Sequence, residues 1–342
     1  MSKKDKEEEE CLKYPDALKL PNWKLPFLTY GFFKPDQLAF SQIKEYTNKK
    51  ITPVYINAKL KHVNGMPVLV KEFRDGSQPV KGYVIRFRKK DSKKAYELIC
   101  NSKDMHIYKW DTLKIDNQTV NVLVSADPEK MKNIYRDPDM PDPLQNLYDY
   151  QWENDPVYKN MFYFIDSRFD EVQSKISTRS INPNTRDLAV LFVEVQSLYM
   201  VLWSALDRFL TFRYGLSQKK NLISLSEEEF FKDALEEQVK SNHTVLSAEN
   251  LKQITLDKKS PKCSAFYYYT LRNNVVHNGK MNVNEIEMLF DALKELLNIF
   301  EYILNAVKDE TKKNLYDLRE TRSEWEAREN PLKFDSYDEL KD

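Results

Sequence analysis

Glycine is scarce in this chain, which has 342 residues and only six glycines, where average usage is about 7%. A Walker A phosphate loop needs two glycines followed by Lys and Ser or Thr, and a dinucleotide fingerprint needs three glycines close together. The closest pair here, Gly76 and Gly82, has no third glycine between its members. The sequence therefore excludes ATP, GTP and dinucleotide sites of these two kinds.

Cysteine is also rare, and the three residues, Cys11, Cys100 and Cys263, are widely spaced. This spacing excludes a disulfide framework and a structural zinc site, and it favours a reducing compartment. The N-terminal segment lacks the apolar core of a signal peptide. The longest charge-free stretch, Val195–Leu206, has 12 residues, whereas a membrane span needs about 20. We expect a cytoplasmic protein with no membrane span, no metal and no cofactor.

The formal charge balances overall, with 53 basic and 53 acidic residues, but it is unevenly distributed. Residues 1–130 carry a charge of +8 and residues 131–342 a charge of −8. A basic half joined to an acidic half indicates either contact between the two or a polyanionic partner for the first half. Scattered surface charge explains the same totals equally well.

The residue pattern predicts an α+β protein of two domains, because a strand-rich half precedes a helix-rich half. The expected organisation is a charged tail (1–26), a strand-rich domain (27–130), a Pro/Asp-rich linker (131–156), a helical domain (157–310) and a charged extension (311–342). Strands are predicted at Val54–Ile56, Pro67–Lys71, Val80–Arg88, His106–Ile115 and Thr119–Val124, with a short helix at Gln37–Tyr46 and turns at Asn64-Gly65 and Asp75-Gly76.

The second half shows helical periodicity, with apolar residues three and four positions apart. A long apolar helix is predicted over Arg186–Tyr214, with Gly215 as its C-terminal stop. Ser226 and Glu229 form a capping-box pattern for a helix over Glu227–Val239. Further helices are predicted at Phe162–Ile176, Pro261–His277 and Val283–Val307.

The stretch from Arg272 to His277 combines an arginine, two asparagines and a histidine at the end of a predicted helix. In an α-helix, Asn273 and His277 share a face, and the helix dipole favours the protonated imidazole in the last turn. An arginine that stabilises phosphoryl charge beside a histidine that moves protons suits phosphodiester chemistry.

This Arg272-Asn273-x-x-x-His277 motif, inside a helical segment, resembles the HEPN superfamily, many of whose members are metal-independent endoribonucleases. The resemblance implies an all-α HEPN bundle, a homodimer that pairs two motifs, and cleavage of RNA by its own 2′-hydroxyl. It assigns His277 as general acid/base, Arg272 as phosphate stabiliser and Asn273 as orienting residue. Glu194 and Asp207 are weaker candidates for a supporting polar residue. The alternative is a HEPN bundle used only for dimerisation or nucleotide binding.

Residues 28–124 resemble the γ-glutamylcyclotransferase-like fold, a small mixed β-barrel. The resemblance rests on the loop Tyr30-Gly31-Phe32-Phe33, on Gly65–Val68, on Val80–Val84 and on Tyr108. It implies that the Tyr30–Phe33 loop binds a ligand through backbone N–H groups.

Two positions depart from the cyclotransferase pattern. Phe32 stands where that family has Ser or Thr, and Cys100 stands where it has the catalytic Glu, with Glu97 three residues too early. A thiol in a strand-like apolar context is a poor proton shuttle, because its unperturbed pKa is about 8.5. We therefore expect a degenerate domain used for binding, unless Glu97 is the acid.

Six basic residues fall within nine positions in the first half: Arg86, Arg88, Lys89, Lys90, Lys93 and Lys94. They indicate contacts to an RNA backbone, or alternatively a solvated loop after a strand.

These observations predict a dimeric cytoplasmic endoribonuclease, a toxin or defence effector, whose first domain senses a small molecule, an antitoxin or another partner. Two alternatives stay open. One is a cyclotransferase-type enzyme with the helical domain as a dimeriser, and the other is a non-catalytic interaction protein.

Overall fold

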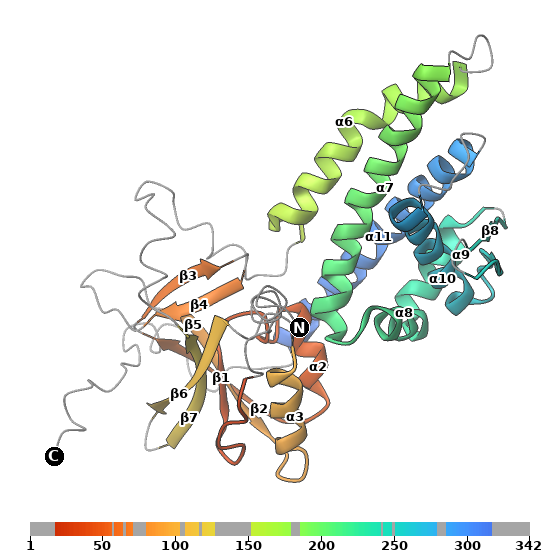
Figure 1. Ribbon diagram of the computed structural model, residues 1–342. Helices are drawn as coiled ribbons and strands as arrows, with labels where there is room; N and C mark the ends of the chain where they lie inside the picture. The colour runs from red at the N-terminus through yellow and green to blue at the C-terminus, as the bar shows by residue number, and fades with distance from the viewer. Residues whose placement is uncertain are drawn as a thin grey trace, which may run out of the picture. The chain divides into compact units, whose positions relative to one another are not determined.

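The computed structural model describes residues 18–56, 58–63, 66–70, 80–102, 107–115, 118–126, 152–178, 185–240, 242–247, 250–278 and 285–316. The chain divides into two compact units. The sheet unit comprises Met1–Asp149 with Lys313–Asp342, and the helical unit comprises Tyr150–Lys312. Strands gather in the first unit and helices in the second (Figure 1), which confirms the predicted α+β class. The turns at 64–65 and 75–76 and residues 131–151 of the predicted linker (131–156) lie outside the described residues.

The sheet unit is built on five strands in the order β2-β5-β1-β7-β6. Its central strand, β1, pairs antiparallel with β5 and parallel with β7. The alternating valines of β7, Val120, Val122 and Val124, join a core that includes Leu28 and Val84. The strands are β1 (Phe27–Thr29), β2 (Thr47–Ile56), β5 (Val80–Phe87), β6 (Tyr108–Ile115) and β7 (Gln118–Ser125).

The predicted small barrel is wrong, because this sheet is open. Closure requires the two edge strands, β2 and β6, to pair with each other, and they do not. The strands β3 (Lys59–Val63) and β4 (Met66–Val70), which follow β2, pair with each other as a separate antiparallel ribbon instead of bridging the edges.

A helix that the sequence did not predict, α3 (Ser92–Cys100), packs on the sheet. Tyr96 of α3 makes edge-to-face contacts with Phe27, Phe87 and Trp110, with ring centroids 5.4–6.2 Å apart. The strand-like context expected for Cys100 is therefore wrong, since this residue ends a helix. The helix α3 is amphipathic: Ala95, Tyr96 and Ile99 recur at helical spacing and are buried on one face.

The end of the predicted charged tail contributes to the sheet unit. The hydroxyl of Tyr96 donates to the Leu25 carbonyl at 2.9 Å, and the amide of Asn121 donates to both the Asn22 carbonyl and the Tyr96 hydroxyl, each at 2.9 Å. The predicted short helix appears as η1 (Leu38–Phe40) and α2 (Ser41–Lys44).

The helical unit contains more elements than the sequence predicts. The elements are η3 (Trp152–Asn154), α6 (Pro156–Thr178), α7 (Thr185–Tyr214), α8 (Gln218–Glu227), α9 (Glu229–Gln238), β8 (Thr244–Leu246), β9 (Gln253–Thr255), α10 (Pro261–Asn273), the π-helix η4 (Asn274–Asn278) and α11 (Ile286–Tyr316). The expected stop of α7 is confirmed, since Gly215 has a φ of 65° and donates to Thr211 at 2.9 Å. The last helix, α11, continues to Tyr316, past the end of the helical unit at Lys312 and into the predicted C-terminal extension.

The predicted capping box is wrong. Ser226 lies inside α8, where its hydroxyl donates to the Ile223 carbonyl at 2.7 Å, and α9 starts only at Glu229.

The core of the helical unit is aromatic. Tyr158 and Phe209 meet Phe300 of α11 edge to face, and the Tyr199 hydroxyl donates to the Tyr268 carbonyl at 2.8 Å.

By length and composition alone, the segment Arg186–Tyr214 of α7 could cross a membrane, which the 12-residue charge-free stretch did not lead us to expect. Core helices of water-soluble proteins pass the same test, and 44% of its most apolar window is buried inside the protein.

Candidate functional site

The motif segment lies where α10 changes to a π-helix. Arg272 and Asn273 are the last residues of α10, and the π-helical turn Asn274–Asn278 contains His277. In a π-helix the backbone hydrogen bonds join residues five apart. The turn is thus wider than the α-helical turn on which the shared face of Asn273 and His277 was predicted, and both Arg272 and Asn273 precede His277 by about one turn. The His277 side chain and Gly279 lie outside the described residues.

Two side-chain hydrogen bonds organise this segment. The Arg272 guanidinium, half-buried, donates from Nη1 to Asn273 Oδ1 at 3.0 Å. Asn274, which is 7% exposed, donates from Nδ2 to the carbonyl of Leu246 at 2.8 Å. The motif resemblance assigns no role to Asn274, although this second asparagine stands inside the motif.

In the part of the motif that the structure describes, neither candidate for a supporting carboxylate is bonded to Arg272 or Asn273. Glu194 forms an ion pair with Lys175 of α6 at 3.4 Å, and Asp207 accepts a hydrogen bond from Gln218 of α8 at 3.1 Å. Tyr199, which bonds α10, is five residues from Glu194, and at about 100° per residue the two side chains point to different sides of α7. The structure thus brings together Arg272 and Asn273, whereas Glu194 and Asp207 contact side chains outside the motif.

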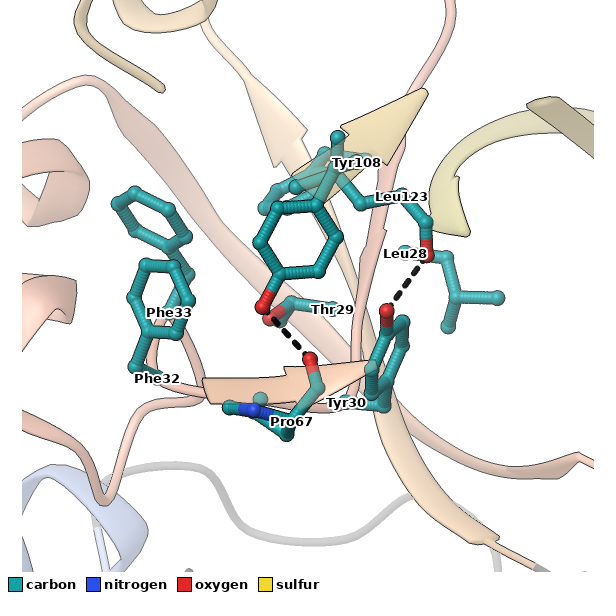
Figure 2. A pocket seen from close by; sticks show the side chains of 10 residues that line it. Leu28, Thr29, Tyr30, Phe32, Phe33, Pro67, Tyr108 and Leu123 are labelled. Carbon is teal, nitrogen blue, oxygen red and sulfur yellow. Dashed lines mark hydrogen bonds between the residues drawn. The ribbon is translucent and has the colours of Figure 1, made fainter. Parts of the chain in front are cut away.

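The predicted ligand-binding loop lines a cavity in the sheet unit (Figure 2). The cavity has a volume of about 10 Å³, close to the minimum that holds one water molecule. Its lining residues are Phe27, Leu28, Thr29, Tyr30, Gly31, Phe32, Phe33, Pro67, Tyr108 and Leu123. The loop therefore sits at a cavity, but one too small for an amino-acid derivative.

Hydrogen bonds close this cavity from two sides. The Tyr30 hydroxyl donates to the Leu123 carbonyl at 2.6 Å and accepts from the Leu69 amide at 3.0 Å, while the Tyr108 hydroxyl donates to the Pro67 carbonyl at 2.6 Å. Burial raises the pKa of Tyr30 far above its usual range, so this hydroxyl stays protonated. The two phenyl rings of Phe32 and Phe33 occupy one flank (Figure 2).

The candidate proton shuttles of a cyclotransferase do not reach this cavity. None of the lining residues belongs to α3, which carries Glu97 and Cys100. Glu97 is half-exposed and pairs with Lys93 at 3.8 Å. Burial raises the pKa of the Cys100 thiol, so less of it is present as the thiolate at neutral pH.

The basic run divides into paired and unpaired cations around the start of α3. Arg86 donates to Gln118 at 2.5 Å, Arg88 pairs with Asp91 at 2.7 Å, and Lys94 lies 5.1 Å from the ring centroid of Tyr46. Lys89 and Lys90 occupy the exposed turn before α3 and form no hydrogen bond or ion pair with the described residues. These two lysines are the freest cations of the run.

Comparison of the chain with protein-family models, with curated proteins and with solved structures finds no match in any of the three.

Proposed function

We propose that the helical unit is a metal-independent endoribonuclease of HEPN type, acting as a homodimer in which the Arg272–His277 segments of two copies form one cleft. The observation that supports this proposal best is the π-helical turn Asn274–Asn278, which contains His277 and directly follows Arg272 and Asn273 at the end of α10. π-helical turns are rare and occur frequently at functional sites.

In the proposed reaction the ribose 2′-oxygen attacks the adjacent phosphorus, and the bond from phosphorus to the 5′-oxygen breaks. The products are a 2′,3′-cyclic phosphate and a 5′-hydroxyl end. His277 accepts the 2′-hydroxyl proton or protonates the 5′-oxygen, and Arg272 stabilises the charge on the phosphoryl oxygens. Asn273 accepts a hydrogen bond from Arg272 and so fixes the direction of the guanidinium. In the proposed dimer, one His277 takes the 2′-hydroxyl proton while the other copy's His277 protonates the 5′-oxygen, so the step balances with groups of the two copies.

Under this proposal the sheet unit has a binding or sensing role, for RNA, a small molecule or an antitoxin-like protein. A water-sized cavity at the Tyr30–Phe33 loop, with no acid from α3 beside it, argues against a working cyclotransferase.

The test incubates purified full-length protein with total RNA in EDTA and compares wild type with His277→Ala and Arg272→Ala. We expect wild type to cleave RNA and leave cyclic phosphate ends, and each variant to be 10²–10⁴-fold slower. His243→Ala is the matched control, because His243 lies in a polar segment before β8 and is outside the motif. Equal cleavage by wild type and His277→Ala would reject the proposal.

A further inference from the structure

The π-helical turn needs support from outside its own sequence. It holds Val275 and Val276 side by side, and β-branched residues lose rotamer freedom in helical turns. The turn also ends its helix, so its last carbonyl groups lack partners within α10. Local preference alone does not hold this segment in its unusual conformation.

The β8–β9 hairpin and the segment that follows it are hydrogen-bonded to the two ends of the helical segment that begins with α10. At the start of α10, Ser264 donates to the carbonyl of Asp257 at 2.7 Å and accepts from the Asp257 amide at 3.1 Å, and Ser264 is fully buried. At the other end, buried Asn274 donates to the carbonyl of Leu246, the last residue of β8, at 2.8 Å. The hairpin itself therefore holds the motif end of this segment, and the residues just after β9 hold its start.

The hairpin itself is well defined. Leu246 pairs with Gln253, and the hydroxyls of Thr244 and Thr255 lie 3.0 Å apart across the two strands. In the loop, Leu251 adopts a φ of 57° and is 73% exposed. The loop backbone is itself hydrogen-bonded, because the Leu251 amide donates to the Ser247 carbonyl at 2.9 Å and the Ser247 amide donates to the Lys252 carbonyl at 2.8 Å. The hairpin is therefore a formed structure against which a helix end can be fixed.

We propose that Asn274 is a positioning residue, which fixes the π-helical turn to the β8–β9 hairpin and thereby sets the spacing between Arg272 and His277. The catalytic part of this proposal rests on the proposed ribonuclease function, whereas the structural part does not. An error of about 1 Å in the placement of catalytic groups costs on the order of 10²-fold in rate.

The test variant is Asn274→Asp, which keeps the shape of the side chain but places an acceptor against the Leu246 carbonyl. Asn250→Asp is the matched control on the same hairpin, because the Asn250 side chain accepts from the Lys252 amide at 3.1 Å and Asp accepts equally well. If Asn274→Asp does not fold, Asn274→Ser removes the same hydrogen bond without adding charge.

Two measurements on full-length protein decide the outcome. We expect the amides of residues 275–278 to exchange with solvent about tenfold faster in Asn274→Asp, with the core of α7 unchanged and Asn250→Asp like wild type. We also expect kcat for RNA cleavage to fall tenfold or more while KM stays constant, because groups acting only in the transition state are displaced.

The possible outcomes separate the two proposals. Unchanged exchange at residues 275–278 in the Asn274 variants overturns the positioning role, whatever the cleavage rate. Faster exchange with an unchanged kcat also overturns it. If wild type cleaves no RNA, the ribonuclease proposal fails, and the exchange measurement alone still decides whether Asn274 holds the turn.

Discussion

The rings of Phe32 and Phe33 lie 4.7 Å apart between centroids and fill one flank of the cavity in the sheet unit. Phe32 is partly exposed, whereas Phe33 is buried. Under the proposed resemblance to cyclotransferases, position 32 would carry a small hydroxyl residue, and the Phe32 ring would take the space of a ligand.

Replacing Phe32 by Ser is therefore expected to open the cavity. The variant should lose about 1–3 kcal/mol of unfolding free energy, less than a fully buried phenylalanine costs. Millimolar 5-oxoproline should also raise the melting temperature of the variant, whereas it should leave that of wild type unchanged. Phe164→Ser, at an exposed phenylalanine of α6, is the control for the chemical change. A rise of equal size in wild type would show that Phe32 does not block the cavity.

The chain approaches Gly31 and Gly82 so closely that we expect a side chain at either position to lower the stability of the sheet unit. A Cβ atom on residue 31 would lie 2.7 Å from Pro67 Cγ, and one on residue 82 would lie 2.9 Å from the backbone oxygen of Thr29. A proline ring shifts more easily than a strand backbone, so Gly82→Ala should destabilise more than Gly31→Ala. We expect the milder variant to lose about 1–3 kcal/mol, measured by urea denaturation. The reverse order, or an unchanged midpoint for both, contradicts this account.

Sequence periodicity predicted those elements whose burial repeats along the chain. The helix α7 and its end at Gly215 followed from apolar spacing and one glycine, and β5 to β7 followed from runs of β-branched residues. Such patterns are local, because the apolar residues of each buried face recur at a fixed spacing within one short stretch of sequence.

Elements that depend on a distant partner were not predictable. The helix α3 begins with exposed lysines, so its sequence does not show a clear apolar pattern. It is stabilised by Tyr96, which packs on aromatic side chains of three strands. The π-helical turn differs from an α-helix by a single hydrogen-bond partner, and the Asn274 contact that accompanies it reaches back to Leu246. Whether a five-stranded sheet closes is likewise decided by how its edge strands meet.

A half-buried carboxyl group predicts how stability depends on pH. Burial raises the pKa of Glu295 on α11 to about 7, and the charge of Asp291 adds to this, while the nearby Lys240 backbone and the Tyr268 hydroxyl act in the opposite direction. In the unfolded chain a glutamate titrates near 4.3. Between these values the folded state holds a proton that the unfolded state has lost, so stability falls as pH rises from about 4 to 7.

Glu295→Gln removes this titration. The variant should match wild type in unfolding free energy near pH 4 and exceed it above pH 7, measured by urea denaturation at several pH values. Glu301→Gln, at an exposed position of the same helix, should follow the wild-type profile. A constant difference between Glu295→Gln and wild type at all pH values would contradict a raised pKa.

The exposed lysines before α3 predict the salt dependence of RNA binding. Each phosphate contact to single-stranded nucleic acid contributes about 0.7 to the slope of log affinity against log salt concentration. Lys89 and Lys90 form no hydrogen bond or ion pair with the described residues, whereas Arg88 and Lys93 each pair with a carboxylate. Replacing both lysines by Gln should therefore lower the slope by about 1.4, measured by fluorescence anisotropy with a labelled single-stranded RNA.

Lys219→Gln/Lys220→Gln removes the same charge from an exposed turn of α8 and should leave the slope unchanged. Equal slopes for all three proteins would mean that the turn before α3 does not contact RNA phosphates.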